Sequence, residues 1–270
     1  MPVRKPRAFL FDMDGVLYND TLPIAGSREA LAWVRSQKIP HLFVTNTSSQ
    51  SRRHLAEKLT TMGIQATAGD VLCPPAAAAD WLREHARGTS TAEQVALFIP
   101  PNARAEFAGL DPLPPDAETG AHYVVIGDLA EAWDFRTINR AFRLLHSNPD
   151  SQLIALGMTR YWQTPEGLQL DVAPFVAALE HASRKQAIVF GKPAAPFFNA
   201  AARKLGVPPA DILMIGDDME IDVDGAQKSG MRAAIVKTGK FRPADFERGV
   251  TPDVVLDSIA SLHTWFESIH

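Results

Sequence analysis

The sequence has almost no cysteine, since Cys73 is the only one among 270 residues. An intrachain disulfide and a zinc site built from several cysteines are therefore excluded. The eight histidines lack the HxxxH and HExxH spacings of zinc enzymes. Any chemistry that the chain performs is expected to use other ligands and nucleophiles.

Long apolar runs and blocks of basic residues are also missing. No run approaches the roughly 20 apolar residues of a membrane-spanning helix. The apolar stretch near the start, residues 8–11, is too short for the core of a signal peptide. The net charge is −4, and lysine and arginine do not cluster, so a nucleic-acid partner is not indicated. We expect a cytoplasmic globular protein with no membrane or nucleic-acid partner.

Short apolar runs alternate with helical patterns at both ends of the chain. The segment 27–37, for example, places Ala30, Leu31 and Val34 at helical spacing. This alternation predicts parallel βαβ units in an α/β sheet. The expected strands of this sheet are 7–12, 41–46, 187–192, 211–218 and 232–239.

The middle of the chain differs in composition, because residues 88–122 are rich in proline, glycine and small polar residues. Further apolar runs at 94–99, 122–128 and 152–158 and a helical pattern at 135–147 predict a second α/β unit. We expect a discontinuous core domain of residues 1–75 and 184–270, and an inserted domain of residues 76–183. Within the insert, Trp133 and Phe135 are expected to pack in the core.

Four polar motifs follow predicted core strands. In open α/β sheets, ligands bind outside the carboxyl ends of the strands. An aspartate at a strand end is more often a turn-former, so the inference rests on the convergence of all four motifs. They are Asp12-Met13-Asp14-Gly15, Thr45-Asn46, Gly191-Lys192-Pro193, and Gly216-Asp217-Asp218 with Asp222.

The charges of these motifs indicate a metal and a phosphate. Asp12, Asp14 and Asp217 would place three negative charges in one crevice, which requires a cation. Mg²⁺ fits, because it prefers carboxylate, water and phosphate oxygens. Lys192 and the Thr45 hydroxyl are then expected to bind an anion. This combination favours phosphoryl transfer through an aspartyl-phosphate.

The same motifs, DMDGVLY, FVTNTS, GKP and GDDMEID in this order, resemble motifs one to four of the haloacid dehalogenase (HAD) superfamily of phosphatases. The long insert resembles the α/β cap, of the C2 type, in the NagD-like branch of this superfamily. The resemblance implies a Rossmann-like parallel-sheet core with an inserted α/β cap domain.

The resemblance also implies catalytic and metal-binding roles. Asp12 would be the nucleophile and a Mg²⁺ ligand. Asp14 would bind the metal through its backbone carbonyl, and its side chain would act as general acid and then as general base. Asp217 would be the third protein ligand, and Asp222 would contact the ligands without touching the metal. Asp218 is expected either to do the same or to be the N-cap of the following helix.

Phosphate binding is implied for Thr45, Asn46 and Lys192. At the position of Asp14, the animal members of the branch that resemble this chain have a serine. The retained aspartate favours ordinary phosphomonoester hydrolysis.

The residues that select the substrate are expected in the cap. Arg160, Tyr161 and Trp162 follow a predicted strand and can form a loop over the active site. The alternative is that Tyr161 and Trp162 fill the core of the cap. By analogy with the family, a homodimer that pairs through the cap is expected.

The leading hypothesis is a Mg²⁺-dependent phosphatase that acts on a small phosphorylated metabolite. Hydrolysis of inorganic pyrophosphate, phosphohistidine or phospholysine is the alternative within enzymes. A catalytically weak phosphate-sensing or interaction protein is the alternative from another class. A nucleotide-binding dehydrogenase is disfavoured, because no GxGxxG follows the first predicted strand.

Overall fold

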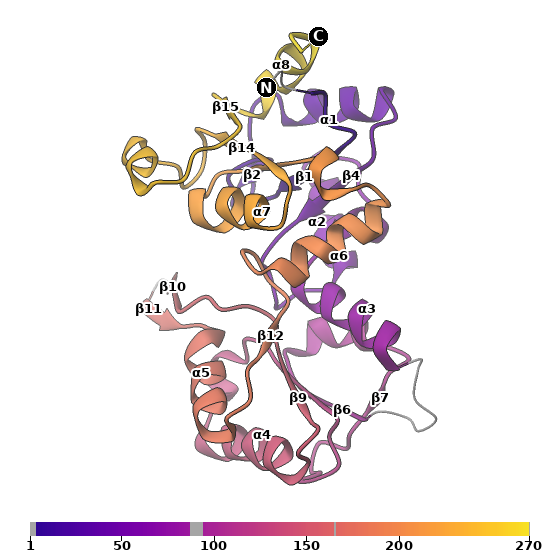
Figure 1. The fold of residues 1–270 in the computed structure, drawn as a ribbon, viewed down its shortest axis with the longest axis vertical. Helices are drawn as coiled ribbons and strands as arrows, with labels where there is room; N and C mark the ends of the chain where they lie inside the picture. The colour runs from indigo at the N-terminus through magenta and orange to yellow at the C-terminus, as the bar shows by residue number, and fades with distance from the viewer. Residues whose placement is uncertain (1–3, 87–93, 165, 270) are drawn as a thin grey trace. The chain divides into compact units, whose positions relative to one another are not determined.

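The computed structural model describes residues 4–86, 94–164 and 166–269, which form two compact units (Figure 1). Unit 1 consists of Met1–Thr45, Arg52–Leu72 and Lys192–His270. Unit 2 consists of Asn46–Ser51 and Cys73–Gly191. Among the described residues, no helix is both long and apolar enough to cross a membrane.

The centre of unit 1 is a six-stranded sheet in which all neighbouring strands are parallel. The strand order is β15-β14-β13-β1-β4-β5. The two central strands, β1 and β13, are entirely buried and apolar up to their last residues, as expected for a sheet that is covered on both faces. The bounds are β1 Ala8–Asp12, β4 His41–Val44, β5 Val71–Leu72, β13 Ile212–Gly216, β14 Arg232–Val236 and β15 Val254–Leu256.

Helices and a small hairpin complete unit 1. In α1 (Ser27–Ser36), the side chains at helical spacing, Ala30, Leu31 and Val34, form the buried face, as predicted. The hairpin of β2 and β3 follows β1 directly. The remaining bounds are β2 Tyr18–Asn19, β3 Leu22–Pro23, α2 Arg52–Thr61, α6 Ala195–Leu205, α7 Gly225–Lys228, α8 Leu262–Glu267, the π-helix η5 Met219–Asp224, and the 3-10 helices η1 Ala68–Asp70, η4 Pro209–Asp211, η6 Pro243–Arg248 and η7 Ile259–Ser261.

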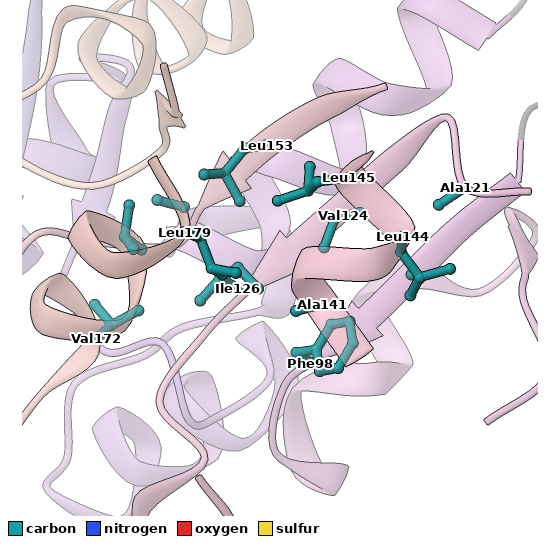
Figure 2. Close-up of a cluster of buried hydrophobic side chains, with 13 residues drawn as sticks. Phe98, Ala121, Val124, Ile126, Ala141, Leu144, Leu145, Leu153, Val172 and Leu179 are labelled. Carbon is teal, nitrogen blue, oxygen red and sulfur yellow. The ribbon is translucent and has the colours of Figure 1, made fainter. Parts of the chain in front are cut away.

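Unit 2 contains a second parallel sheet, with strand order β12-β9-β8-β6-β7. A cluster of buried side chains from α4, α5 and this sheet forms its core (Figure 2). The bounds are α3 Pro74–Ala86, β6 Gln94–Phe98, β7 Asp111–Pro112, β8 Tyr123–Ile126, α4 Phe135–Ser147, β9 Gln152–Ala155, β10 Tyr161–Thr164, β11 Gly167–Leu170, α5 Val172–Ser183, β12 Ile188–Val189, and the 3-10 helices η2 Pro101–Phe107 and η3 Ala130–Ala132. The predicted α/β fold, a parallel-sheet core with an inserted α/β unit, is confirmed.

Two expectations about individual elements were wrong. The predicted core strand at 187–192 is β12, which pairs with β9 in unit 2 instead of joining the sheet of unit 1. β12 has only two residues, and both are half-buried. Its pairing with β9 continues for one more hydrogen bond, in which Phe190 N donates to Ala155 O at 2.8 Å. Trp133 packs as predicted, stacked with Phe98 and Phe175, but Phe135 is 82% exposed. Phe135 is the first residue of α4, and the buried face of this helix begins at a later turn.

Candidate active site

Three strand ends bring polar side chains together on one edge of the unit 1 sheet. Asp12 is the last residue of β1 and pairs with Val44, the last residue of β4, so Thr45 directly follows the end of β4. Phe11 pairs with Ile215 on β13, and Asp217 lies just past the end of that strand. Because the strands are parallel, their carboxyl ends meet at one edge. The side chains at these positions, Asp12, Thr45 and Asp217, are buried.

Lys192 links two buried carboxylates. Its Nζ lies 2.8 Å from Asp12 Oδ1 and 2.7 Å from Asp222 Oδ1. Met13 N also donates to Asp12 Oδ1, at 2.8 Å. Burial acts to lower the pKa of Lys192, but the two carboxylates outweigh it and raise this pKa above its usual range. Lys192 is therefore a fixed positive charge that compensates two aspartates.

Asp222 also holds the backbone that carries Asp217. Its Oδ2 accepts hydrogen bonds from Asp217 N (3.2 Å) and Asp218 N (3.3 Å). The approach is so close that a Cβ on Gly216 would lie 2.3 Å from the Asp222 side chain. Asp218 caps η5, since its side chain accepts from two backbone N–H groups of that helix. Both residues therefore support the end of β13.

Asp217 is fixed by a loop that follows β14. Its Oδ2 accepts a hydrogen bond from Lys240 N at 2.7 Å. A Cβ on Gly15 or Gly239 would lie 2.0 or 2.1 Å from this same oxygen, and both glycines have positive φ, +81° and +64°. Thr238 Oγ1 donates to Gly15 O at 2.5 Å, which joins the loop to the turn after β1. The carboxylate thus has one orientation, enclosed by two glycines.

The Arg242 side chain contacts the backbone of the loop that holds Asp217. Its Nη1 lies within hydrogen-bond distance of three successive carbonyl oxygens, those of Gly239 (3.2 Å), Lys240 (2.9 Å) and Phe241 (2.7 Å). Sequence analysis did not assign a role to this loop. The loop holds Asp217 with the backbone N–H of Lys240 and with the space that Gly239 leaves. Neither feature has a distinctive residue pattern.

The carboxylates fit a divalent cation. One oxygen each of Asp12, Asp217 and Asp222 lies within 4.8 Å of the others. Asp217 Oδ1 is buried and has no hydrogen-bond partner in the part of the chain that the structure describes. Burial raises the pKa of Asp217 to about 6, that of Asp222 to about 7, and that of Asp12 above its usual range. Mg²⁺ prefers oxygen ligands, and these carboxylates supply them. Lys192 alone does not balance the charge of three carboxylates.

Geometry favours Asp12 and Asp217 over Asp222 as cation ligands, although all three lie in the cluster. Both Asp222 oxygens already bind Lys192 or backbone N–H groups. Asp12, in contrast, makes the contacts to Lys192 and Met13 with Oδ1. Asp12 and Asp217, two of the predicted metal ligands, therefore each have a carboxylate oxygen that these contacts leave for a metal.

Asp14 differs from Asp12, Asp217 and Asp222 because it is exposed. It lies on the turn between β1 and the β2–β3 hairpin, where Gly15 N donates to Tyr18 O at 2.7 Å. Its Oδ1 accepts from Asp20 N at 3.3 Å. A carboxylate in this position can exchange protons with solvent, which the buried aspartates cannot do easily.

Of the predicted phosphate ligands, Lys192 lies in the cluster and Thr45 lies beside it in the sheet. Thr45 N donates to Leu72 O at 3.2 Å and so continues the pairing of β4 with β5. The hydroxyl of Thr45 is the group predicted to bind an anion. Asn46 follows directly along the chain and is half-buried.

The three predicted specificity residues lie on unit 2, at the start of the β10–β11 hairpin. Tyr161 is 50% and Trp162 46% exposed, so the alternative that they fill the core of the cap is wrong. The hairpin is a two-stranded sheet of its own, which leaves side chains on it uncovered. Arg160 lies over the Tyr161 ring, 5.7 Å from its centroid.

Comparisons with known proteins agree with this geometry. A family model described as haloacid dehalogenase-like hydrolase matches residues 9–111, and a HAD-hydrolase-like model matches residues 189–262. The phospholysine phosphohistidine inorganic pyrophosphate phosphatase of Rattus norvegicus is 39% identical over 94% of this chain and 92% of its own length. The chain belongs to the haloacid dehalogenase-like hydrolases. The predicted family is confirmed, and the chain is an enzyme.

Other members of the family resemble the chain over similar lengths. Haloacid dehalogenase-like hydrolase domain-containing protein 2 of Mus musculus is 36% identical over 91% of this chain and 89% of its own. Among solved structures, the p-nitrophenyl phosphatase from Archaeoglobus fulgidus has a TM-score of 0.86 at 22% identity, covering 97% of this chain and 100% of that one. NagD from E. coli K-12 has a TM-score of 0.81 at 19% identity, covering 95% and 98%. These structures support the NagD-like fold with an inserted cap.

Proposed function

We propose that the chain is a Mg²⁺-dependent phosphatase that hydrolyses a small phosphorylated metabolite through an aspartyl-phosphate on Asp12. That it is a phosphatase follows from its relatives, since the rat protein, 39% identical, is named a phosphatase. The observation that supports the mechanism is the buried set of Asp12, Lys192 and Asp217, in which Asp217 Oδ1 has no hydrogen-bond partner among the described residues.

Asp12 is the nucleophile in this proposal. Lys192 Nζ and Met13 N both contact Oδ1, which fixes the plane of the carboxylate. One oxygen of this carboxylate attacks phosphorus in the proposal, and the other would bind the metal. Burial raises the pKa of Asp12, so the ammonium group of Lys192 is needed to keep the carboxylate ionised.

Asp12, Asp217 and the backbone carbonyl of Asp14 would hold Mg²⁺. When bound, the ion would neutralise the carboxylates and the negative charge of the phosphoryl group. The close approach of Gly15 and Gly239 to the Asp217 carboxylate supports metal binding, because it fixes the direction in which Asp217 Oδ1 points.

Asp14 carries the proton. Its exposed side chain, held by Asp20 N, can protonate the leaving oxygen and then remove a proton from the attacking water. Thr45, Asn46 and Lys192 are the proposed phosphate ligands, Lys192 with its charge and the other two with neutral donors.

Substrate selection is assigned to unit 2, with Arg160, Tyr161 and Trp162 as the candidate residues. The domain division at residues 1–75, 76–183 and 184–270 and a cytoplasmic location belong to the same proposal and rest on the composition and pattern of the sequence. A homodimer paired through the cap rests on the family resemblance. Hydrolysis of inorganic pyrophosphate, phosphohistidine or phospholysine is the second candidate, because the name of the rat relative includes these substrates.

Hydrolysis of 4-nitrophenyl phosphate with and without Mg²⁺ tests the proposal. We expect activity in the wild-type chain that EDTA removes and Mg²⁺ restores. Asp12→Asn should lower kcat by about 10³-fold or more, because the neutral amide cannot attack phosphorus. Asp224→Asn is the matched control and should keep full activity, because Asp224 is the half-buried last residue of η5 and pairs with Lys228 instead of with the cluster. An inactive wild type, or equal rates for Asp12→Asn, would refute the mechanism.

A further inference from the structure

Unit 2 contains a pocket of about 420 Å³ that none of the proposed catalytic residues lines. Its walls come from the start of α4, the end of β6, η2, η3 and the segment around residues 115–118. The volume lies within the range of small-molecule sites. All residues that line it belong to unit 2, whereas Asp12, Lys192 and Asp217 belong to unit 1.

One side of the pocket is apolar and firmly packed. It is formed by Leu97, Leu129 and the edge of Phe98, whose side chain is only 3% exposed. The Phe98 ring stacks with Trp133, with centroids 6.1 Å apart and planes 11° apart. This packing leaves the apolar wall little freedom to collapse into the pocket.

The lining also contains an arginine that contacts of the chain itself hold in place. The Arg140 guanidinium lies 4.9 Å from the centroid of the Phe98 ring. Its Nε donates to Ala117 O at 2.8 Å, and its Nη2 donates to Pro114 O at 3.1 Å. Its hydrogen bonds go to neutral carbonyls, while Glu118 and Asp116 in the same lining are the carboxylates that act on its charge.

Two more arginines line the same pocket. Arg136 precedes Arg140 by one helical turn, on the same face of α4, and Arg104 comes from η2. Neither guanidinium makes a hydrogen bond or an ion pair with the residues that the structure describes. Of the two acidic residues in the lining, Glu118 is engaged by Arg143, with Arg143 Nη2 2.8 Å from Glu118 Oε1. The pocket therefore has an excess of positive charge.

We propose that this pocket binds a small organic oxyanion, a compact apolar body that carries one sulfonate, carboxylate or phosphate group. The apolar body contacts Leu97, Leu129 and Phe98, and the oxyanion binds Arg104, Arg136 and Arg140. Guanidinium groups bind such oxyanions in a planar, two-point geometry. The site is additional to the phosphatase centre and does not depend on the proposed reaction.

Isothermal titration of the full chain with 2-naphthalenesulfonate tests the site, because this probe cannot be hydrolysed as a phosphate ester. We expect one site per chain. Arg104→Ala and Arg136→Ala should each weaken binding about tenfold, the effect of one charge-assisted hydrogen bond. The matched control is Arg53→Ala, which removes an exposed arginine of unit 1 and should leave the affinity unchanged.

A second variant and a second probe give independent tests. Ala132→Trp fills the pocket from its exposed rim without changing the charge, and should abolish binding while circular dichroism stays that of the wild type. The uncharged probe 2-naphthol should bind at least tenfold more weakly than the sulfonate. The proposal is overturned if the sulfonate does not bind, if Ala132→Trp binds it like the wild type, or if 2-naphthol binds equally well.

Discussion

Replacing Asp217 with asparagine should stabilise the protein without metal and remove its response to Mg²⁺. Asparagine has the same shape, and its amide oxygen can still accept the hydrogen bond from Lys240 N. What disappears is one negative charge in a buried cluster with Asp12 and Asp222. The same substitution therefore has opposite effects on metal-free stability and on metal binding.

The size of the first effect follows from the pKa of Asp217, which burial raises from 3.8 to about 6. A group whose pKa is higher in the folded state opposes folding once it is ionised. This penalty appears as the pH rises from 3.8 through 6, and at pH 8 it corresponds to about 3 kcal/mol. Asp217→Asn should raise the unfolding temperature in EDTA at pH 8 by roughly 5–10 °C. The difference from wild type should vanish near pH 4.

Mg²⁺ removes most of this difference between the two proteins. At 100 times the dissociation constant, a ligand stabilises the folded state by about 2.7 kcal/mol, and only the wild type should gain this. Thermal unfolding at pH 8 and pH 4, in EDTA and in MgCl₂, measures both effects, with Asp224→Asn as the control. The reasoning would be refuted if Asp217→Asn were less stable than the wild type in EDTA, or if Mg²⁺ stabilised Asp217→Asn as much as it stabilises the wild type.

The loop that encloses Asp217 gives two more predictions. Gly239→Ala places a Cβ 2.1 Å from the Asp217 carboxylate and 2.6 Å from Gly15 Cα, and should cost about 3 kcal/mol of unfolding free energy together with most Mg²⁺ affinity. Gly249→Ala, also at positive φ but with nothing within 4 Å, should cost about 1 kcal/mol and leave Mg²⁺ binding unchanged. Arg242→Ala should weaken Mg²⁺ binding in calorimetry about tenfold, since three carbonyls lose their donor; unchanged affinity would show that the loop holds its shape without this side chain.

The fold and the centre of the site could be predicted because parallel strands end at one edge. Asp12, Thr45 and Asp217 each follow an apolar run, and this pattern alone places them together. The residues of a two-residue strand do not determine which sheet the strand joins. For this reason β12 was assigned to the wrong sheet. Its neighbours in space are far away in sequence, and only the packed structure selects among them.

Contacts made by backbone groups were beyond the sequence analysis. The N–H of Lys240 and the open space at Gly239 orient Asp217, yet any lysine and many loop glycines present the same groups. The ion pair between Lys192 and Asp222 was also not predicted, because Asp222 was expected only to support the metal ligands. Exposure was hard to predict as well, since Asp14 is exposed while Asp12, two residues earlier, is buried.

The measurement that tests the central claim most directly is rapid-quench analysis of Asp14→Asn with ³²P-labelled 4-nitrophenyl phosphate and Mg²⁺. Nitrophenolate leaves without a proton, so Asp12 should still be phosphorylated, whereas hydrolysis should slow because no base activates water. We predict a stoichiometric burst of nitrophenolate, with the label on the peptide that contains Asp12. Steady product release without a burst, or label on another residue, would contradict the proposed aspartyl-phosphate mechanism.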